Sequence, residues 1–417
     1  MTDNRGDTWL GGQRDSPTSY GPSGYRPNAI HTALVLAGLL GRIQPLALTP
    51  AWLALAAIAS WPWNGLRVPV GVMSLAFILT DGASLALLPR MGRSFGPVTP
   101  PLLALTLIRT AVTFVSGLLW SVMWHSGRGE TWPFLVLTVV LNLALSTVSF
   151  YATWIEPFRV GITRAELHST KLEGQVPLRL LHITDLHIER ITLRERQLLY
   201  LVEELAPHII VLTGDYLTLS SVHDSDAQAG AYGLLAELCD IAGPQCPIFA
   251  ITGSPPVDHP DTVPAAFAEL PIAWLLDATE ELRLNGHTLR IAGLRCTADR
   301  NRDVPRLRRL LEGGAAQANV HTPFTLLLYH SPDLMSEAVE LGVDLYLCGH
   351  THGGQIRLPI FGAIFTSSDF GKRYEMGRYE EANTTLYVSR GLGMEGLGAP
   401  RARFLAPPEI VLWTLSS

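Results

Sequence analysis

The sequence predicts an α/β protein in two parts, an N-terminal bundle of transmembrane helices followed by a layered α/β domain with mixed sheets. At 417 residues the chain is long enough for two or three domains, and nearly all of its excess apolar residues lie before Glu156. From about residue 176 onward, short apolar runs alternate with amphipathic stretches, as strands and helices do in layered α/β domains. The predicted regions are a disordered polar tail at 1–28, a transmembrane helical domain at 29–156, a linker at 157–175 and the α/β domain at 176–417.

The composition narrows the classes of function. The formal net charge is -6 and no long basic run occurs, which argues against nucleic acid as a partner. The four cysteines (Cys239, Cys246, Cys296 and Cys348) show no CxxC spacing. We interpret them as buried thiols in a reducing compartment, with a Cys239–Cys246 disulfide as the alternative under oxidising conditions.

The apolar segments of the first part recur, whereas a signal peptide has one segment that ends at a cleavage site. A helical span needs roughly 20 mainly apolar residues, and the last three candidates reach that length. The first two are short and meet at Gly41, Arg42 and Pro45, so they are either two spans or a hairpin or re-entrant pair, giving four or five spans in all. The candidates are 29–47, 48–64, 68–89, 100–124 and 132–155. Tryptophans near their ends predict an aromatic belt: Trp61, Trp63, Trp120, Trp124, Trp132 and Trp154.

The orientation depends on the distribution of basic residues. Five spans would divide arginine and lysine almost evenly between the two sides. If 29–64 does not cross twice, the positive-inside rule places both termini in the cytoplasm. We therefore expect a multi-pass protein of the cell membrane, with the lipid bilayer as a partner and the α/β domain on the cytoplasmic side. Asp81 and Arg109 lie inside spans, and we interpret them as a structural pair rather than a transport pathway.

Apolar runs and turn signals place the elements of the α/β domain. The helix expected at 192–205 carries one apolar face, and Asn285-Gly286 between two strand-like runs indicates a hairpin. Strands are expected at 178–184, 208–213, 248–252, 290–294, 324–329, 345–348, 385–389 and 409–415. Helices are expected at 192–205, 227–240, 262–270, 303–313 and 333–341.

Four of these strands end in Asp or His. The residues concerned are Asp185 and His187, Asp215, His330, and His350 with His352. A buried apolar strand is rigid, so a polar residue at its end is held at the rim of the sheet, where open α/β sheets bind ligands. Singly, each motif is more often a cap, a turn or a satisfied core histidine. Their joint occurrence argues for one site, and imidazole with carboxylate suits Zn, Fe and Mn.

The motifs Asp185-Leu-His187, Gly214-Asp215, His330 and Gly349-His350-Thr-His352, in this order, resemble those of the calcineurin-like metallophosphoesterase superfamily. The segments GHTHGGQIRLPIFG and LYVSRGLGMEG are similar to the membrane-associated YkuE-like branch and to transmembrane proteins with a metallophosphoesterase domain. The resemblance implies a four-layer α/β/β/α sandwich that hydrolyses a phosphate mono- or diester with two divalent metal ions (Mn, Fe or Zn). It also implies the ligand sets: Asp185, His187 and His352 for one metal, His330 and His350 for the other, and Asp215 as the bridge.

The chain departs from the family pattern at one motif. Where the family has Gly-Asn-His followed by an acid, this chain has Gly253-Ser254-Pro255. Ser254 is a poorer ligand than the amide it replaces, and Pro255 supplies no proton donor, a loss that typically lowers the rate on the order of 10²–10⁴-fold. Asp258 and His259 follow, and we interpret both as residues of a solvated loop.

The sequence therefore leaves more than one function open. The first is a membrane-anchored metallophosphoesterase in which Asp215, His350 and His352 are catalytic and a hydroxide between the metals attacks a phosphoester, such as a lipid-linked one. The alternative is a catalytically impaired metal-binding sensor or scaffold, suggested by Ser254-Pro255. A transporter with an appended domain would need more polar residues inside the spans. The GxGxxG run at 391–396 precedes no helical pattern, so we interpret it as a loop near the metals and not as a dinucleotide site.

Overall fold

The computed structural model describes residues 37–125, 130–259, 262–315, 323–396 and 400–417. The chain forms two compact units, one mainly of helices within 27–155 and the other made of 156–395 and 403–417. The predicted polar tail at 1–28 lies outside the described residues, as do residues 29–36 of the first predicted span.

The helical unit contains three helices that are long and apolar enough to cross a membrane, by length and composition. They are α3 (Arg67–Arg90), α4 (Thr99–His125) and α5 (Thr131–Phe150), which agree with the last three predicted spans. The second predicted span corresponds to α2 (Thr49–Ser60), a shorter helix of 12 residues that follows a 3-10 turn at Pro45–Leu48.

Polar groups inside the helical unit pair with one another, as the structural interpretation of Asp81 and Arg109 required. The guanidinium of Arg109 donates from Nε and Nη2 to the two carboxylate oxygens of Asp81 over 2.6 and 2.9 Å. Its Nη1 donates to the backbone oxygen and the side-chain oxygen of Asn142.

The prediction of an aromatic belt is wrong for Trp63 and Trp120. These two side chains are buried and stacked, with ring centroids 5.4 Å apart.

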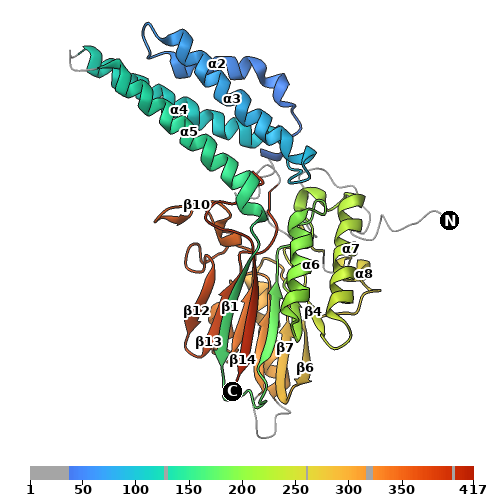
Figure 1. The fold of residues 1–417 in the computed structure, drawn as a ribbon. Helices are drawn as coiled ribbons and strands as arrows, with labels where there is room; N and C mark the ends of the chain where they lie inside the picture. The colour runs from blue at the N-terminus through green and yellow to red at the C-terminus, as the bar shows by residue number, and fades with distance from the viewer. Residues whose placement is uncertain (1–36, 126–129, 260–261, 316–322, 397–399) are drawn as a thin grey trace, which may run out of the picture. The chain divides into compact units, whose positions relative to one another are not determined.

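The α/β unit is built on two six-stranded sheets (Figure 1). The first has the order β1-β14-β2-β3-β4-β5, and the second has the order β12-β13-β9-β8-β7-β6. The strands of the first are β1 (Gly161–His168), β14 (Glu409–Ser416), β2 (Leu178–Ile183), β3 (Ile209–Leu212), β4 (Ile248–Ala250) and β5 (Ile272–Trp274). Those of the second are β12 (Gly377–Glu381), β13 (Thr384–Val388), β9 (Leu345–Cys348), β8 (Phe324–Leu328), β7 (His287–Gly293) and β6 (Ala278–Leu284).

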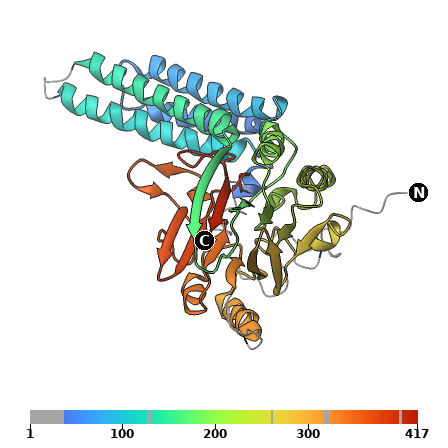
Figure 2. The ribbon, with the colours of Figure 1, turned by 60° about the horizontal axis from the view of Figure 1, so that its bottom comes forward.

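Helices cover the outer face of each sheet, on opposite sides of the sandwich (Figure 2). The helices α6 (Leu193–Leu205), α7 (Ser225–Ala242) and α8 (Val263–Ala266) cover the first sheet, and α9 (Arg300–Ala315) and α10 (Met335–Glu340) cover the second. Along β2, Leu180 packs between the sheets, while its neighbour Leu181 packs under α6 and α7. The unit is therefore the four-layer α/β/β/α sandwich that the resemblance implied, with central strands buried on both faces.

Most predicted elements agree with the structure to within a few residues. The helix expected at 262–270 is shorter, since α8 ends at Ala266, and the missed strands of the two large sheets lie at their edges. The range assigned to a linker contains β1, which pairs along its whole length with β14. Half of the residues of β1 are polar or charged. Along the strand, exposed residues largely alternate with half-buried ones, so β1 has no apolar run. The edge strand β12 was missed for the same reason. All four cysteines are buried and free, so Cys239 and Cys246 form no disulfide.

The parallel strands of both sheets bring their carboxyl ends to one edge of the sandwich. In the first sheet β2, β3 and β4 are parallel, and in the second β8, β9 and β13 are parallel. The loops that follow these strands hold the predicted site residues.

Candidate metal centre

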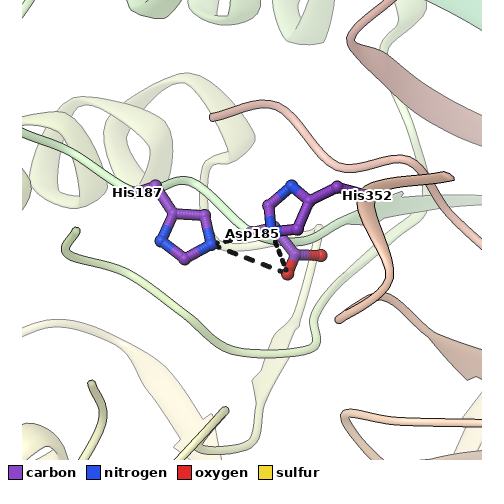
Figure 3. Close-up of side chains that lie close together, drawn as sticks. All are labelled: Asp185, His187 and His352. Carbon is purple, nitrogen blue, oxygen red and sulfur yellow. Dashed lines mark hydrogen bonds and ion pairs between the residues drawn. The ribbon is translucent and has the colours of Figure 1, made fainter. Parts of the chain in front are cut away.

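The six predicted ligands meet at this edge in two groups of three. Asp185, His187 and His352 form the first group, from the loops after β2 and β9 (Figure 3). Asp215, His330 and His350 form the second group, from the loops after β3, β8 and β9. All six are buried or nearly so, and within each group the donor atoms lie within 4.8 Å of one another.

The first group places two imidazole nitrogens face to face. The Nε2 atoms of His187 and His352 are 3.0 Å apart, and they lie 3.9 and 3.5 Å from Oδ1 of Asp185. Two ligands of one divalent cation, each bound at about 2.0–2.1 Å, are separated by about 2.9–3.4 Å for angles between octahedral and tetrahedral. The pair of imidazoles has the spacing expected for one cation, with the carboxylate slightly farther out.

With Ser254 included, five of the six separations between the donor atoms of the second group are close to the edge length of one regular tetrahedron. Nε2 of His330 lies 3.2 Å from Oδ2 of Asp215 and 3.2 Å from Nδ1 of His350. The Ser254 Oγ lies 3.1, 3.2 and 3.3 Å from these same three atoms. The centre of a tetrahedron with such edges is about 2.0 Å from each corner, which is the length of a bond from Zn²⁺ to nitrogen or oxygen.

Asp215 connects the two groups. Its Oδ2 lies 3.2 Å from Nε2 of His330 in one group and 3.6 Å from Nε2 of His187 in the other. Its Oδ1 accepts a hydrogen bond of 2.6 Å from the backbone N–H of Ser254. One carboxylate oxygen therefore faces both groups, which is the position that a bridging ligand occupies.

The backbone at the site is held in an unusual conformation. Five of the six residues, all except His330, have positive φ angles between 42° and 70°. Non-glycine residues rarely adopt this conformation, and such residues concentrate at functional sites. Neighbouring loops hold it in place, since the backbone N–H of Asp185 donates to Gly214 and that of His187 donates to Asp215.

Two glycines allow the loops to approach this closely. A Cβ on Gly349 would lie 1.9 Å from Oδ2 of Asp185, and a Cβ on Gly253 would lie 2.2 Å from Oδ1 of Asp215. Any side chain at either position would displace a carboxylate of the site. The glycines that the sequence analysis noted beside the motifs are therefore required by close packing.

Backbone carbonyls orient the imidazoles. The carbonyl of Thr213 lies 2.7 Å from Nδ1 of His330, so this nitrogen carries a proton and Nε2 is turned toward Asp215 and Ser254. The carbonyl of Leu217 lies 3.2 Å from Nδ1 of His187, on the side of the ring opposite His352. Such partners fix the tautomer of a metal-binding histidine.

Burial shifts the pKa values of Asp185 and His187 toward the neutral forms of these groups, whereas the pKa of His330, beside Asp215, is shifted toward the charged form. Burial raises the pKa of Asp185 to about 6 and lowers the pKa of His187 to about 4. Burial also acts to lower the pKa of His330, but the adjacent Asp215 carboxylate outweighs it and raises this pKa to about 10. His330 and Asp215 thus form a buried ion pair, and a divalent cation at the same place would satisfy the same carboxylate. Donor types, spacing and charge all fit a pair of divalent metal ions.

Two functional residues were missed or misinterpreted from the sequence. The carboxylate of Asp258, which we expected in a solvated loop, is buried and accepts from the backbone N–H groups of Asp215, Tyr216 and Gly253. Glu395 lies with its Oε2 3.1 Å from Nδ1 of His187, and no motif pointed to it. The glycines Gly391 and Gly393, in the loop that precedes Glu395, pack against Asp185 and His187, as the sequence analysis expected.

Comparisons with known proteins identify the family. Residues 178–354 match the family model described as calcineurin-like phosphoesterase. The chain is 32% identical over 275 residues to the uncharacterized metallophosphoesterase YkuE of Bacillus subtilis, a match that covers 64% of this chain and 89% of the relative. It is 28% identical over 292 residues to the phosphodiesterase YaeI of Escherichia coli, covering 66% of this chain and 95% of the relative.

A shorter stretch of the chain, 94 residues long, matches a third relative. The chain is 37% identical over 94 residues to the UDP-2,3-diacylglucosamine pyrophosphatase LpxG of Chlamydia trachomatis, covering 21% of this chain and 27% of that protein. The fold, the order of the motifs and the two relatives matched over most of their length all indicate the same family. The chain belongs to the calcineurin-like metallophosphoesterase family and is a hydrolase of phosphoester bonds.

Proposed function

We propose that this protein is a membrane-anchored phosphodiesterase that binds two divalent metal ions through Asp185, His187 and His352 on one side and His330, His350 and Ser254 on the other, with Asp215 between them. The observation that carries the proposal is the position of Oδ2 of Asp215, 3.2 Å from His330 and 3.6 Å from His187. A carboxylate oxygen shared in this way reduces the repulsion between two cations.

Ser254 takes the place of the amide ligand that the family has at this position. Its hydroxyl lies 3.1–3.3 Å from three other donor atoms, so it completes a four-coordinate arrangement without moving. A hydroxyl is a weaker donor than an amide oxygen, and we therefore expect the second cation to be held less tightly than the first.

When bound, the two ions lower the pKa of water and neutralise charge on the phosphoryl oxygens. The residues of the chain supply the geometry. Thr213 and Leu217 orient the rings of His330 and His187 through their carbonyls, and the backbone N–H of Ser254 fixes the carboxylate of Asp215. Pro255 has no proton to give to the leaving group, so the favoured substrates are esters whose leaving group departs without protonation.

The physiological substrate is proposed to be an ester at the bilayer surface, such as a lipid-linked phosphodiester. Three helices suited to crossing a membrane precede the α/β unit, and LpxG is named as a pyrophosphatase of UDP-2,3-diacylglucosamine, a diacylated sugar nucleotide. The distribution of basic residues favours the cytoplasmic face. The second candidate function is a metal-binding sensor or scaffold, and the replacement of the family histidine by Pro255 is the observation that favours it.

Metal analysis of the purified chain, combined with hydrolysis of bis(p-nitrophenyl) phosphate in the presence of Mn²⁺, Zn²⁺ or Fe²⁺, tests the proposal. We expect more than one metal per chain and measurable hydrolysis, both of which Asp215→Ala removes. The exposed carboxylate of Asp226 provides the matched control, because Asp226→Ala should change neither quantity.

The double variant Ser254→Asn with Pro255→His restores the family motif and separates the two candidate functions. If the protein is an enzyme, turnover of an unactivated alkyl phosphodiester, whose leaving group needs a proton, should rise on the order of 10²-fold or more, since a positioned proton donor is worth that much. Bound metal with no turnover before or after the repair would establish the scaffold and refute the enzyme.

A further inference from the structure

A short hairpin next to the metal centre exposes an unusual concentration of apolar side chains. The hairpin consists of β10 (Arg357–Leu358), β11 (Gly362–Ala363) and the residues around them up to Phe365. Five large apolar side chains are exposed within eight residues: Leu358, Ile360, Phe361, Ile364 and Phe365. Exposed apolar patches of this kind mark binding surfaces for proteins, ligands or membranes.

The tip of the hairpin is strained as well as exposed. Ile360 is fully exposed and has a φ of 68°, in the left-handed region. This conformation is rare for a β-branched residue and costs on the order of 1–3 kcal/mol, and the exposed side chain gains no packing in return. A residue that is both strained and exposed indicates that the shape of the loop serves a contact outside the α/β unit.

The hairpin is held firmly to the metal centre. Arg357 donates from Nη1 to the carbonyl of Gly353, the residue after His352, over 2.7 Å. Its Nη2 forms a 2.8 Å ion pair with Glu375, a carboxylate that also lies 3.5 Å from the ammonium of Lys372. The apolar tip is thus presented on a rigid support, so little conformational entropy is lost when it binds.

A cation accompanies the aromatic ring at the tip. The ammonium of Lys372 lies 3.7 Å from the ring centroid of Phe361 and donates to the backbone carbonyl of the same residue. Phenylalanine and isoleucine beside a lysine are typical of segments that lie in a membrane interface. In such segments the apolar side chains enter the acyl region and the lysine ammonium remains at the headgroups.

We propose that the hairpin 357–365 inserts into the surface of the lipid bilayer and so brings the metal centre to it. The same chain carries three helices suited to crossing a membrane, and only Arg159 and Val160 separate the last of these apolar helical stretches, Thr131–Phe158, from β1. The α/β unit is therefore tethered close to any bilayer that those helices cross. The claim that the surface presents a lipid-linked ester rests on the proposed function; the insertion itself does not.

Site-directed fluorescence on the full-length chain in phosphatidylcholine nanodiscs tests the insertion. The four native cysteines are buried, so a cysteine introduced at the surface is labelled selectively. Ile360→Cys and Phe361→Cys report on the tip, and Val176→Cys, an exposed apolar position elsewhere in the α/β unit, is the matched control. We expect nitroxide groups on the lipid acyl chains to quench the labels at 360 and 361 several-fold more than the label at 176, and iodide in the buffer to do the reverse.

The outcomes separate this proposal from the proposed function. If iodide quenches the labels at both tip positions as strongly as it quenches the control label at 176, the insertion is refuted. This holds whatever phosphoesters the samples hydrolyse. Tip labels protected from iodide but not quenched by lipid nitroxide would indicate a protein partner, and would overturn it too. Insertion in samples that bind no metal would leave the hairpin assignment intact and refute the phosphodiesterase. A cooperative thermal unfolding transition, measured on each variant by circular dichroism, establishes independently of metal content that the α/β unit is folded.

Discussion

Asp258 provides the sharpest test of how the metal centre is held together. Its carboxylate is buried and accepts hydrogen bonds of 2.6 Å from the N–H of Asp215, 2.8 Å from Gly253 and 3.2 Å from Tyr216. Since the first two donors belong to the bridging residue and to the loop that carries Ser254, this one side chain ties the β3 and β4 loops together. We expect it to act as a positioning residue that touches neither metal nor substrate.

The size of the effect follows from the number of groups left without an acceptor. Asp258→Ala leaves two short hydrogen bonds and one longer one unmade in a buried region, at about 1–3 kcal/mol for each unsatisfied group. The loss is therefore about 3–9 kcal/mol for the three groups. Asp258→Asn can keep its oxygen toward Asp215 and Gly253 and loses mainly the longer bond to Tyr216, so about 1–2 kcal/mol is expected.

Thermal unfolding and metal analysis of the purified chain measure both consequences. At about 2–4 °C per kcal/mol, Asp258→Ala should lower the Tm of the α/β unit by about 6–36 °C. The metal content should fall from two toward one per chain, because the second group loses the orientation of Asp215 and Ser254. Asp226→Ala, at an exposed carboxylate, is the control. Wild-type metal content and an unfolding temperature equal to that of the control would refute the positioning role.

Two further contacts can be tested by substitution, one beside the candidate metal centre and one in the helical unit. Glu395→Ala removes the carboxylate 3.1 Å from Nδ1 of His187, and should weaken binding of the first metal by about 10–100-fold, as loss of an outer partner of a metal-binding histidine does. Glu395→Gln keeps an acceptor and should have a smaller effect; equal metal affinities in titrations of both variants and the wild type would contradict this role. In the helical unit, Arg109→Met leaves Asp81 buried without its partner and should destabilise that unit by about 3–5 kcal/mol. The double variant Asp81→Leu with Arg109→Met should recover most of this loss in chemical unfolding, and no recovery would show that the two side chains are not coupled.

The sequence predicted the six site residues because the physics of parallel strands is local and repetitive. An apolar run such as that before Asp215 is recognisable without any tertiary information, and its carboxyl end must lie beside those of its parallel neighbours. Six donor residues from four segments could therefore be assigned to one site before their distances were known. Ser254 could be placed in the site by the motif, but only the structure shows its hydroxyl at 3.1–3.3 Å from three other donors.

The remaining features could not be predicted, because they depend on contacts between distant segments. Asp258 follows two prolines and has the appearance of a loop residue, and its burial results from N–H groups about 40 residues away in the chain. Glu395 meets His187 across 208 positions of sequence without any motif. The edge strand β1 alternates exposed and half-buried residues and so lacks the apolar run by which the central strands were recognised. The hairpin 357–365 lay inside a recognised motif as far as Gly362, yet its exposure and the strain at Ile360 are visible only in the folded chain.

The left-handed backbone at five of the six candidate ligands connects these findings. Each such residue costs about 1–2 kcal/mol relative to ordinary backbone, and their sum is comparable with the whole stability of a typical domain, about 5–15 kcal/mol. This conformation persists because loops from both sheets hydrogen-bond across the site, with Asp258 as the acceptor that joins two of them. The strain turns the side chains of successive loops toward common points, which unstrained turns at the same strand ends would not do. Part of the folding free energy of the sandwich thus offsets the backbone strain that orients the donors. A cation that binds between the donors would stabilise the folded chain and offset part of that strain.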